Sequence, residues 1–283
     1  MRVVVTGASG GIGRYVVAGL TARGHEVHAV DRIAPPAGSA GPGVAWSVGD
    51  VRDPEFMTSV MAVARPEGLV HLAAIPRPSL GTPLEVFATN TQATFVALET
   101  AGVAGVRRVA IASSTSALGT VFASPPVSPR YVPVDEDHPF VGTDPYALSK
   151  QVDEATAATM QRRHGYQVAA LRIPNTGPLE GQIVRAAEVA RDPSDLAREL
   201  WAYLDVRDGA VAFALAIERD IPGCHVINVM APDTLSPEPT ADLLARFHPA
   251  SELRRPMIGR EVPFDLARSR DLLEFSAAHR LPE

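Results

Sequence analysis

The chain has 283 residues and a formal net charge of −6 at pH 7, and 46% of its residues are hydrophobic. This length suits one α/β domain with a modest appended lobe, and the negative charge argues against a nucleic-acid-binding surface. No apolar run approaches the ~20 residues of a membrane span. Cys224 is the only cysteine, which excludes an internal disulfide and argues against a metal site. A glycine-rich segment follows Met1 so closely that we expect no signal peptide and a cytoplasmic location.

Strands and helices alternate over the first two thirds of the chain. Short β-branched runs predict strands at 2–6, 26–30, 69–73, 108–112 and 167–171, and longer segments predict helices at 12–23, 87–102 and 151–164. The Pro- and Gly-rich residues 34–43 predict a surface loop. Such alternation is typical of a doubly wound parallel sheet, an α/β fold with helices on both faces.

Beyond Pro174 the pattern weakens. Residues 174–193 and 231–264 are rich in Pro, Gly and Arg and predict loops with short elements, whereas 201–218 predicts a strand and a helix and 226–229 one more strand. We therefore expect a Rossmann domain over 1–174, to which 202–230 return. Residues 175–201 and 231–283 would form a small C-terminal, substrate-binding lobe.

A glycine loop lies between the first strand and the first helix. It reads Thr6-Gly7-Ala8-Ser9-Gly10-Gly11-Ile12-Gly13. Glycines let the backbone turn sharply and approach a pyrophosphate, while the helix N-terminus supplies N–H donors. Gly7, Ser9, Gly10, Gly11, Ile12 and Gly13 are therefore the predicted pyrophosphate-binding residues.

Asp31, at the end of the second strand, strengthens this interpretation. A carboxylate at this position accepts both ribose hydroxyls of NAD and repels a 2′-phosphate, which favours NAD. Arg32 keeps NADP open as an alternative, because an arginine can pair with that phosphate. Asp50 and Val51, after a third strand, are expected to meet the adenine.

One further segment is expected beneath the dinucleotide. Leu72, Ala73 and Ala74 offer small apolar side chains at the end of a strand. Ordinary packing at strand ends is the alternative for these three residues and for Asp50 and Val51.

Tyr146 and Lys150 are four residues apart at the start of a helix and share one of its faces. Lys150 is the only lysine among 26 basic residues, so arginine meets every other demand for a basic side chain. A fixed ammonium close to a tyrosine favours the phenolate and makes the tyrosine a better base. Upstream, Ser113, Ser114 and Thr115 bring hydroxyls to the tip of a strand, where α/β folds place ligands.

These features together resemble the short-chain dehydrogenase/reductase superfamily, in its extended branch of NAD-dependent epimerases and dehydratases. The resemblance covers residues 1–230 and rests on the glycine loop, Asp31, Asp50-Val51, His71-Leu72-Ala73-Ala74, Asn90-Thr91, Ser113-Ser114, Tyr146 to Lys150, and Leu171-Arg172 with Asn175. It implies that Tyr146 exchanges a proton with the substrate while Ser114 holds the substrate oxygen.

The resemblance also implies roles for neighbouring residues. Lys150 would bind the nicotinamide ribose as well as act on Tyr146, a double role that suits a compact ammonium. Asn90 would steady a water next to the lysine. The backbone of Pro174 would meet the nicotinamide amide.

Departures from the family pattern bear on the substrate. The sequence has Ala117-Leu118-Gly119 where the family has Val-Tyr-Gly, and Trp201 where nucleotide-sugar enzymes place a diphosphate-binding arginine. With the short C-terminal lobe, this favours a smaller substrate, as in compact uronate-dehydrogenase-like members. Thr115, Arg172, Asn175 and Trp201 are the further candidate substrate residues, although Ser116 replaces a histidine of those enzymes and Arg172 has a structural alternative.

Three functions follow from these patterns. The first is an NAD(P)-dependent oxidoreductase acting on a secondary alcohol or ketone of a small polar substrate. The second is an epimerase or dehydratase with no net redox change, and the third is a non-catalytic NAD-binding regulator. Relatives pair through two long helices, so we expect a homodimer formed by 87–102 and 151–164.

Overall fold

The computed structural model describes residues 1–35, 41 and 43–282, so most of the predicted loop at 34–43 lies outside the described residues. Seven parallel strands form the central sheet in the order β10-β7-β5-β4-β1-β2-β3. They are β1 (Arg2–Thr6), β2 (Glu26–Asp31), β3 (Val44–Val48), β4 (Gly68–His71), β5 (Arg108–Ser114), β7 (Gln167–Ile173) and β10 (Cys224–Asn228). The predicted doubly wound α/β fold is confirmed.

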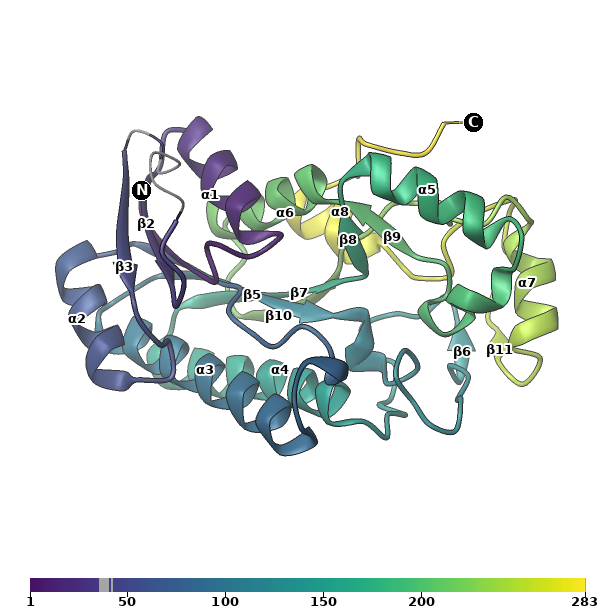
Figure 1. Cartoon of the computed structure of the whole chain (residues 1–283), viewed down its shortest axis with the longest axis horizontal. Helices are drawn as coiled ribbons and strands as arrows, with labels where there is room; N and C mark the ends of the chain where they lie inside the picture. Colours follow the sequence, from purple (N-terminus) through teal and green to yellow (C-terminus); the bar gives the residue numbers. More distant parts are fainter. Residues whose placement is uncertain (36–40, 42, 283) are drawn as a thin grey trace.

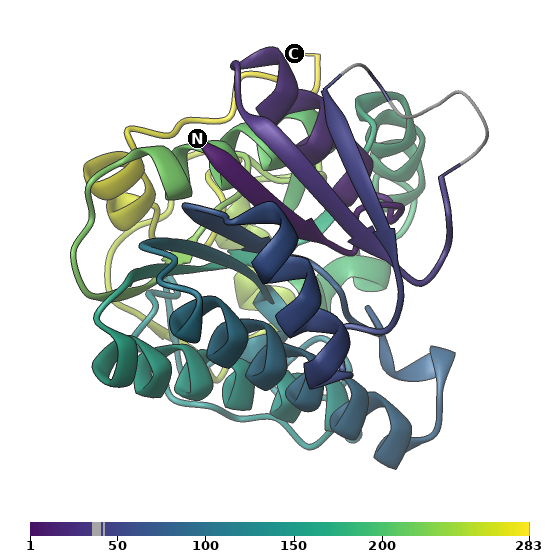
Figure 2. The ribbon, with the colours of Figure 1, turned by 90° about the vertical axis from the view of Figure 1, so that its left-hand side faces the viewer.

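Helices cover both faces of this sheet (Figures 1 and 2). The helices α2 (Pro54–Ala64), α3 (Pro83–Val103) and α4 (Pro145–His164) lie on one face, and α1 (Gly13–Ala22) and α6 (Val206–Glu218) on the other. Each face buries its own cluster of apolar side chains. None of the helices in the described part of the chain is both long and apolar enough to cross a membrane.

Helix starts follow capping residues that the sequence prediction did not use. The helix α3 begins at Pro83 because Thr82 and Glu85 form a capping box, and α4 begins at Pro145 because the side chain of Asp144 accepts from the N–H of Ala147. The helix α2 was missed entirely, although Asp53 caps it and proline occupies its first position.

The remaining elements gather at one end of the sheet (Figure 1). They include α5 (Leu179–Val189), the 3-10 helix η3 (Pro193–Glu199), α7 (Thr240–Phe247), and the strand pairs β8 (Asn175–Gly177) with β9 (Tyr203–Asp205) and β6 (Tyr131–Val132) with β11 (Glu252–Leu253). The helix α8 (Ala267–Leu273) instead packs against α6 and β10, so part of 231–283 lies on the main sheet. One apolar cluster runs from Val3 to Leu243, so lobe and sheet share a core.

Trp201, a predicted substrate residue, lies in this shared core. Its side chain is fully buried, its indole N–H donates to the carbonyl of Pro193 at 2.7 Å, and its ring lies 5.8 Å from that of Phe247. The expectation that Trp201 contacts substrate is therefore corrected. Both Leu200 and Trp201 have positive φ, a turn that directs the indole into the core.

Replacing the buried indole tests this structural role. We expect Trp201→Ala to lower the free energy of unfolding by about 3–5 kcal/mol, because it opens a cavity and leaves the Pro193 carbonyl without its donor. Chemical denaturation measures this loss. The control Val63→Ala, at a side chain that is 75% exposed, is expected to change stability by less than about 0.5 kcal/mol. A changed KM with unchanged stability in Trp201→Ala would contradict the structural role.

Candidate active site

A groove runs along the carboxyl ends of the central strands. Its narrower part, about 160 Å³, lies beside the glycine loop and Asp31, and its wider part, about 500 Å³, contains Tyr146 and Lys150. Leu72 and Ala74 line both parts, so the two are continuous. This edge of the sheet is where open α/β folds bind ligands.

The glycine loop closes tightly on itself. A Cβ at Gly13 would lie 2.0 Å from the carbonyl oxygen of Gly7, and one at Gly7, whose φ is +69°, would lie 2.7 Å from the nitrogen of Ala73. A Cβ at Gly11 would instead meet no atom within 4 Å. Ile12, at the start of α1, gives the helix no side-chain cap. The free N–H groups there form a site for an anion such as a pyrophosphate.

Asp31 connects this loop to the end of β2. Its carboxylate accepts from the N–H of Ser9 at 2.9 Å and from the N–H of Ile33 at 3.1 Å. The hydroxyl of Ser9 donates to the carbonyl of Ile33. Ser9 therefore holds the loop against β2, while Asp31, Gly7 and Gly10 line the groove together with exposed Arg32. The carboxylate keeps lone pairs for two ribose hydroxyls.

Arg52 lines the same part of the groove and was missed from the sequence. Its guanidinium forks onto the carboxylate of Asp50, with Nη2 2.6 Å from Oδ2, and also reaches the hydroxyl of Thr89. Hydrogen bonds from Arg52 lower the pKa of Asp50. Asp50 and Val51 line this part of the groove, and Arg52 is paired with the Asp50 carboxylate. The expected contact of Asp50 and Val51 with the adenine stays a prediction. The sequence did offer one indication of Arg52, namely that it lies only two residues after Asp50.

Tyr146 and Lys150 project from the first turns of α4 into the wider part of the groove. The lysine Nζ lies 5.9 Å from the centre of the tyrosine ring and donates to the carbonyl of Ala112 at 2.9 Å. The ring of Phe122 packs edge-on against Tyr146 at 5.8 Å. The structure thus brings the predicted pair together at the end of β5.

The strand tip offers several hydroxyls, and their bonds distinguish them. Ser113 donates to buried Glu154 at 2.5 Å, whereas the hydroxyl of Ser114 accepts only from the N–H of Ser116 and keeps its own proton available. Thr115 also lines the groove, at the start of the 3-10 helix η2 (Thr115–Leu118). These contacts favour Ser114 as the hydroxyl that can donate to a ligand.

Asn90 is fully buried beneath the groove. Its Nδ2 donates to the carbonyl of Ile75 at 3.1 Å and to the hydroxyl of Ser149 at 3.0 Å, and its Oδ1 accepts from the N–H of Ile75 at 2.7 Å. Both amide protons are therefore in use. Asn90 thus anchors the segment after β4 to α4, and its expected contact with a water stays a prediction.

Arg172 does not line the groove. Its guanidinium forms two hydrogen bonds of 2.8 Å to the carboxylate of Glu154 and a third to the carbonyl of Glu136. The side chain is only 6% exposed. The suggestion that Arg172 contacts substrate is therefore corrected in favour of its structural alternative.

The end of β7 leads into the far wall of the groove. Pro174 and Asn175 line it, as expected, together with Arg185 and Glu199, which the sequence reasoning missed. Arg185 and Glu199 pair at 3.3 Å, and burial raises the pKa of the Glu199 carboxyl. Arg185 and Glu199 lie far from the motifs along the chain, so nothing in the sequence indicated that they line the groove.

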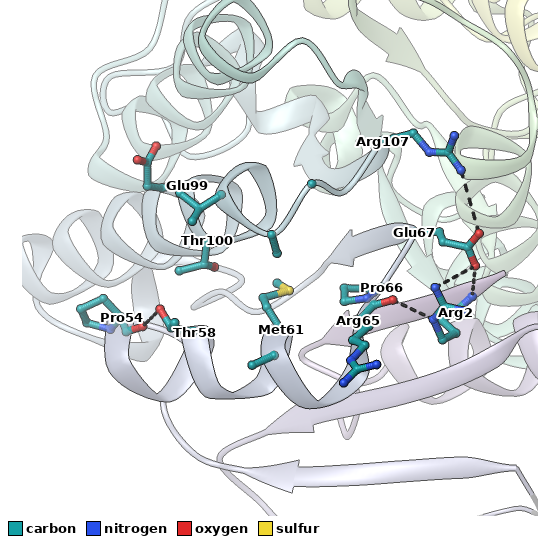
Figure 3. A pocket seen from close by; sticks show the side chains of 14 residues that line it. Arg2, Pro54, Thr58, Met61, Arg65, Pro66, Glu67, Glu99, Thr100 and Arg107 are labelled. Carbon is teal, nitrogen blue, oxygen red and sulfur yellow. Dashed lines mark hydrogen bonds and ion pairs between the residues drawn. The ribbon is translucent and has the colours of Figure 1, made fainter.

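A larger hollow, about 780 Å³, lies at the opposite edge of the sheet between α2 and α3 (Figure 3). Among its charged residues, Glu67 accepts from the backbone N–H of Arg2 at 3.0 Å and lies 4.0 Å from Arg107. These groups are exposed and satisfy one another, and the hollow faces the amino ends of the strands. Position and chemistry therefore favour the groove as the functional site.

The groove fits a dinucleotide: two glycines that admit no Cβ, an uncapped helix N-terminus, a carboxylate at the end of β2, and a Tyr–Lys pair at the far end. These features define a dinucleotide-binding α/β enzyme. A model of the NAD dependent epimerase/dehydratase family matches residues 3–229, and the chain belongs to this family. The resemblance seen in the sequence is confirmed, with NAD as cofactor.

Particular relatives show how far the likeness extends. The chain is 33% identical over 252 residues to a 3-diazoavenalumate denitrifying reductase of Streptomyces sp., covering 80% of this chain and 75% of the reductase. It is 30% identical over 178 residues to the UDP-glucose 4-epimerase of Lacticaseibacillus casei, covering 62% of this chain and 51% of the epimerase. The chain therefore spans only about half the length of such epimerases.

A solved structure agrees in fold. MoeE5 in complex with UDP-glucose and NAD superposes with a TM-score of 0.71 at 26% identity, covering 99% of this chain and 95% of MoeE5.

Two glycine substitutions separate folding of the loop from ligand binding. We expect Gly13→Ala to lower both stability and NAD affinity, the latter by at least about tenfold, because its Cβ collides with the Gly7 carbonyl. The matched variant Gly11→Ala has open space and should keep the melting temperature while weakening NAD binding. Calorimetric titration with NAD and thermal unfolding measure both effects. Equal NAD affinity in all three proteins would exclude this loop as the binding site.

Proposed function

We propose that the protein is an NAD-dependent oxidoreductase that interconverts a secondary alcohol and a ketone on a small polar substrate. The observation that carries the proposal is that Ser114, Tyr146 and Lys150 line the same part of the groove. NAD, when bound, accepts or supplies the hydride. The chain itself then has to move one proton and hold the substrate oxygen.

Each of the three side chains has a distinct task in this proposal. Tyr146 takes the proton of the substrate hydroxyl during oxidation and returns it during reduction. Ser114 donates a hydrogen bond to the same oxygen and holds it near the phenol. The ammonium of Lys150 stabilises negative charge on the tyrosine oxygen and offers an N–H to the cofactor ribose.

The cofactor would lie along the groove from Asp31 to Pro174. Gly7, Gly10, Gly11 and Gly13 would admit the pyrophosphate, and Asp31 would accept the ribose hydroxyls. Arg32 and Arg52 add positive charge near the adenosine end, so NADP stays the alternative cofactor. A cytoplasmic location stays a prediction of the sequence.

Net oxidation or reduction is favoured by the extent of the likeness to the Streptomyces reductase, which covers more of both chains than the likeness to the epimerase. The burial of Trp201, where nucleotide-sugar enzymes place an arginine, supports a smaller substrate. Asn175, Arg185 and Glu199 would contact its polar groups.

The second candidate is a sugar epimerase or dehydratase, and the family description and the epimerase relatives favour it. The two activities differ in their redox balance. An epimerase turns over without added cofactor and without net change in the absorbance of reduced nicotinamide, whereas an oxidoreductase consumes one cofactor per product. Purified protein assayed with a panel of alcohols, ketones and UDP-sugars distinguishes them.

We further propose a homodimer formed through α3 and α4. These helices pack against each other and leave apolar side chains on their outer face, with Leu84 74%, Phe95 51% and Leu148 44% exposed. A second copy of the chain would cover this face. Helix pairs of this kind bury apolar stripes when they associate.

Removing the tyrosine hydroxyl tests the chemistry. We expect Tyr146→Phe to lower kcat by about 10²- to 10⁴-fold with little change in NAD affinity, since only the proton-transfer group is lost. Steady-state kinetics with the active substrate provide the measurement. Tyr166→Phe is the matched control, because Tyr166 lies elsewhere and its hydroxyl makes only a 3.4 Å hydrogen bond to Leu98. Wild-type kcat in Tyr146→Phe would refute the proposed mechanism.

A charge on the outer face of α3 tests the dimer. We expect Phe95→Glu to convert the dimer to a monomer, because burying an unpaired carboxylate costs several kcal/mol. Light scattering gives the mass, and Val63→Glu, at an exposed position of α2, is the control. A wild-type protein that is already monomeric at micromolar concentration would contradict the proposal.

A further inference from the structure

The ammonium of Lys150 has a partner that faces away from the groove. Its Nζ lies 3.1 Å from Oδ2 of Asp153, one turn further along α4, and the two side chains are 5% and 2% exposed. Asp153 does not line the groove, whereas Lys150 does. The carboxylate therefore acts on the lysine from behind and does not reach a ligand.

The hydrogen bonds of the ammonium are divided between these two sides. An ammonium has three donors; one goes to the carbonyl of Ala112 at 2.9 Å and one to Asp153. The third is left for the groove. Two fixed acceptors thus orient the ammonium. The planar guanidinium of an arginine, with its spread-out charge, could not replace the compact ammonium in both contacts.

The carboxylate depends on the lysine in return. Its Oδ1 is buried and has no hydrogen-bond partner among the described residues. A buried carboxylate without a counter-charge is strongly unfavourable. The pair therefore behaves as one neutral unit, and loss of either charge affects the other.

We propose that Asp153 is a positioning residue that keeps the Lys150 ammonium charged and aimed at the groove, and that it thereby sets the upper pH limit of catalysis. This inference rests on the proposed role of Tyr146 and Lys150. It adds a residue that none of the sequence motifs contains. Asp153 would touch neither substrate nor cofactor and would act only through Lys150.

The electrostatic surroundings agree with this role. Burial alone would lower the pKa of Lys150, but the charge of Asp153, followed by Tyr146 and Glu154, raises it above its usual value. From β4, His71 adds no rival charge, because burial and the nearby lysine lower its pKa to about 3. Arg172 of β7 is paired with Glu154. From α3, the uncharged hydroxyl of Thr94 faces both the imidazole of His71 and the carboxylate of Asp153.

The charge of Lys150 determines how catalysis depends on pH. A raised lysine pKa keeps the ammonium through neutral and alkaline pH, and deprotonation above it removes the charge that assists Tyr146. In Asp153→Asn the buried lysine loses its counter-charge, so its pKa falls. The alkaline limb of kcat/KM then moves to lower pH, with about a tenfold loss of rate above the limb for each pH unit.

The single lysine makes a direct test feasible. Protein labelled with ¹⁵N and ¹³C lysine gives one lysine side-chain signal, so its NMR titration in the free protein reports Lys150 without assignment. The wild-type lysine is expected to titrate above a free lysine, and Asp153→Asn clearly lower, whereas Asp153→Glu keeps the charge and retains a raised value. Glu154→Gln is the control. It is expected to lower stability but to shift the titration of Lys150 less than Asp153→Asn does.

Two results would overturn the proposal. One is a wild-type lysine that titrates below free lysine, which needs no variant to measure. The other is an Asp153→Asn protein whose lysine titration and kcat/KM limb coincide with the wild type while only its melting temperature falls, as a space-filling role predicts. The NMR titration requires neither substrate nor cofactor, so it tests the role of Asp153 independently of activity. If Tyr146→Phe kept its activity, the proposed function would be refuted and the NMR result would be unaffected.

Discussion

The buried ion pair between Arg172 and Glu154 holds α4, the helix that carries Tyr146 and Lys150, against the sheet. The guanidinium comes from the end of β7 and the carboxylate from α4, and Glu154 also accepts from Ser113 at the tip of β5. Three elements that carry the site are thereby fixed to one another. Breaking one partner of such a pair leaves a buried charge and costs about 3–5 kcal/mol.

The same pair extends, through the segment before α4, to β10 and α8. Arg172 donates to the carbonyl of Glu136, and the carboxylate of Glu136 in turn accepts from the N–H of Asn228 and lies 3.4 Å from Arg268. The shared apolar core runs in parallel with this polar chain. The lobe shares its apolar core with the sheet and supplies Arg185 and Glu199 to the groove.

The sequence predicted the parts of the site that depend on short-range geometry. Glycines that admit no Cβ, an acidic residue at a strand end, and a Tyr and a Lys one helical turn apart are local patterns, and the fold assembles them in one groove. The family resemblance already pointed to Ser114, and the structure adds the physical distinction: Ser113 donates to Glu154, 41 residues away.

The predictions that failed depended on long-range contacts. Arg172 and Trp201 were predicted to contact substrate from their place in family motifs. Inside the protein, however, Arg172 is paired with Glu154 and Trp201 donates to the Pro193 carbonyl, and no local pattern predicts these contacts. The contacts of Asn90 with the backbone of Ile75 were likewise not predictable from a local pattern. The helix α2 is a different case, since its Asp-Pro start was readable from the sequence.

The lone lysine has a consequence for the chemical reactivity of the whole protein. Arginine provides every other long basic side chain, and guanidinium groups stay protonated and resist acylation under conditions in which amines react. Lys150 is itself only 4% exposed. Apart from its terminal amine, the protein therefore presents no primary amine on its outer surface. Lys150, held as an ammonium by Asp153, has no free lone pair to react, so amine-directed acylation or cross-linking would fall on the chain terminus and leave the candidate site unmodified.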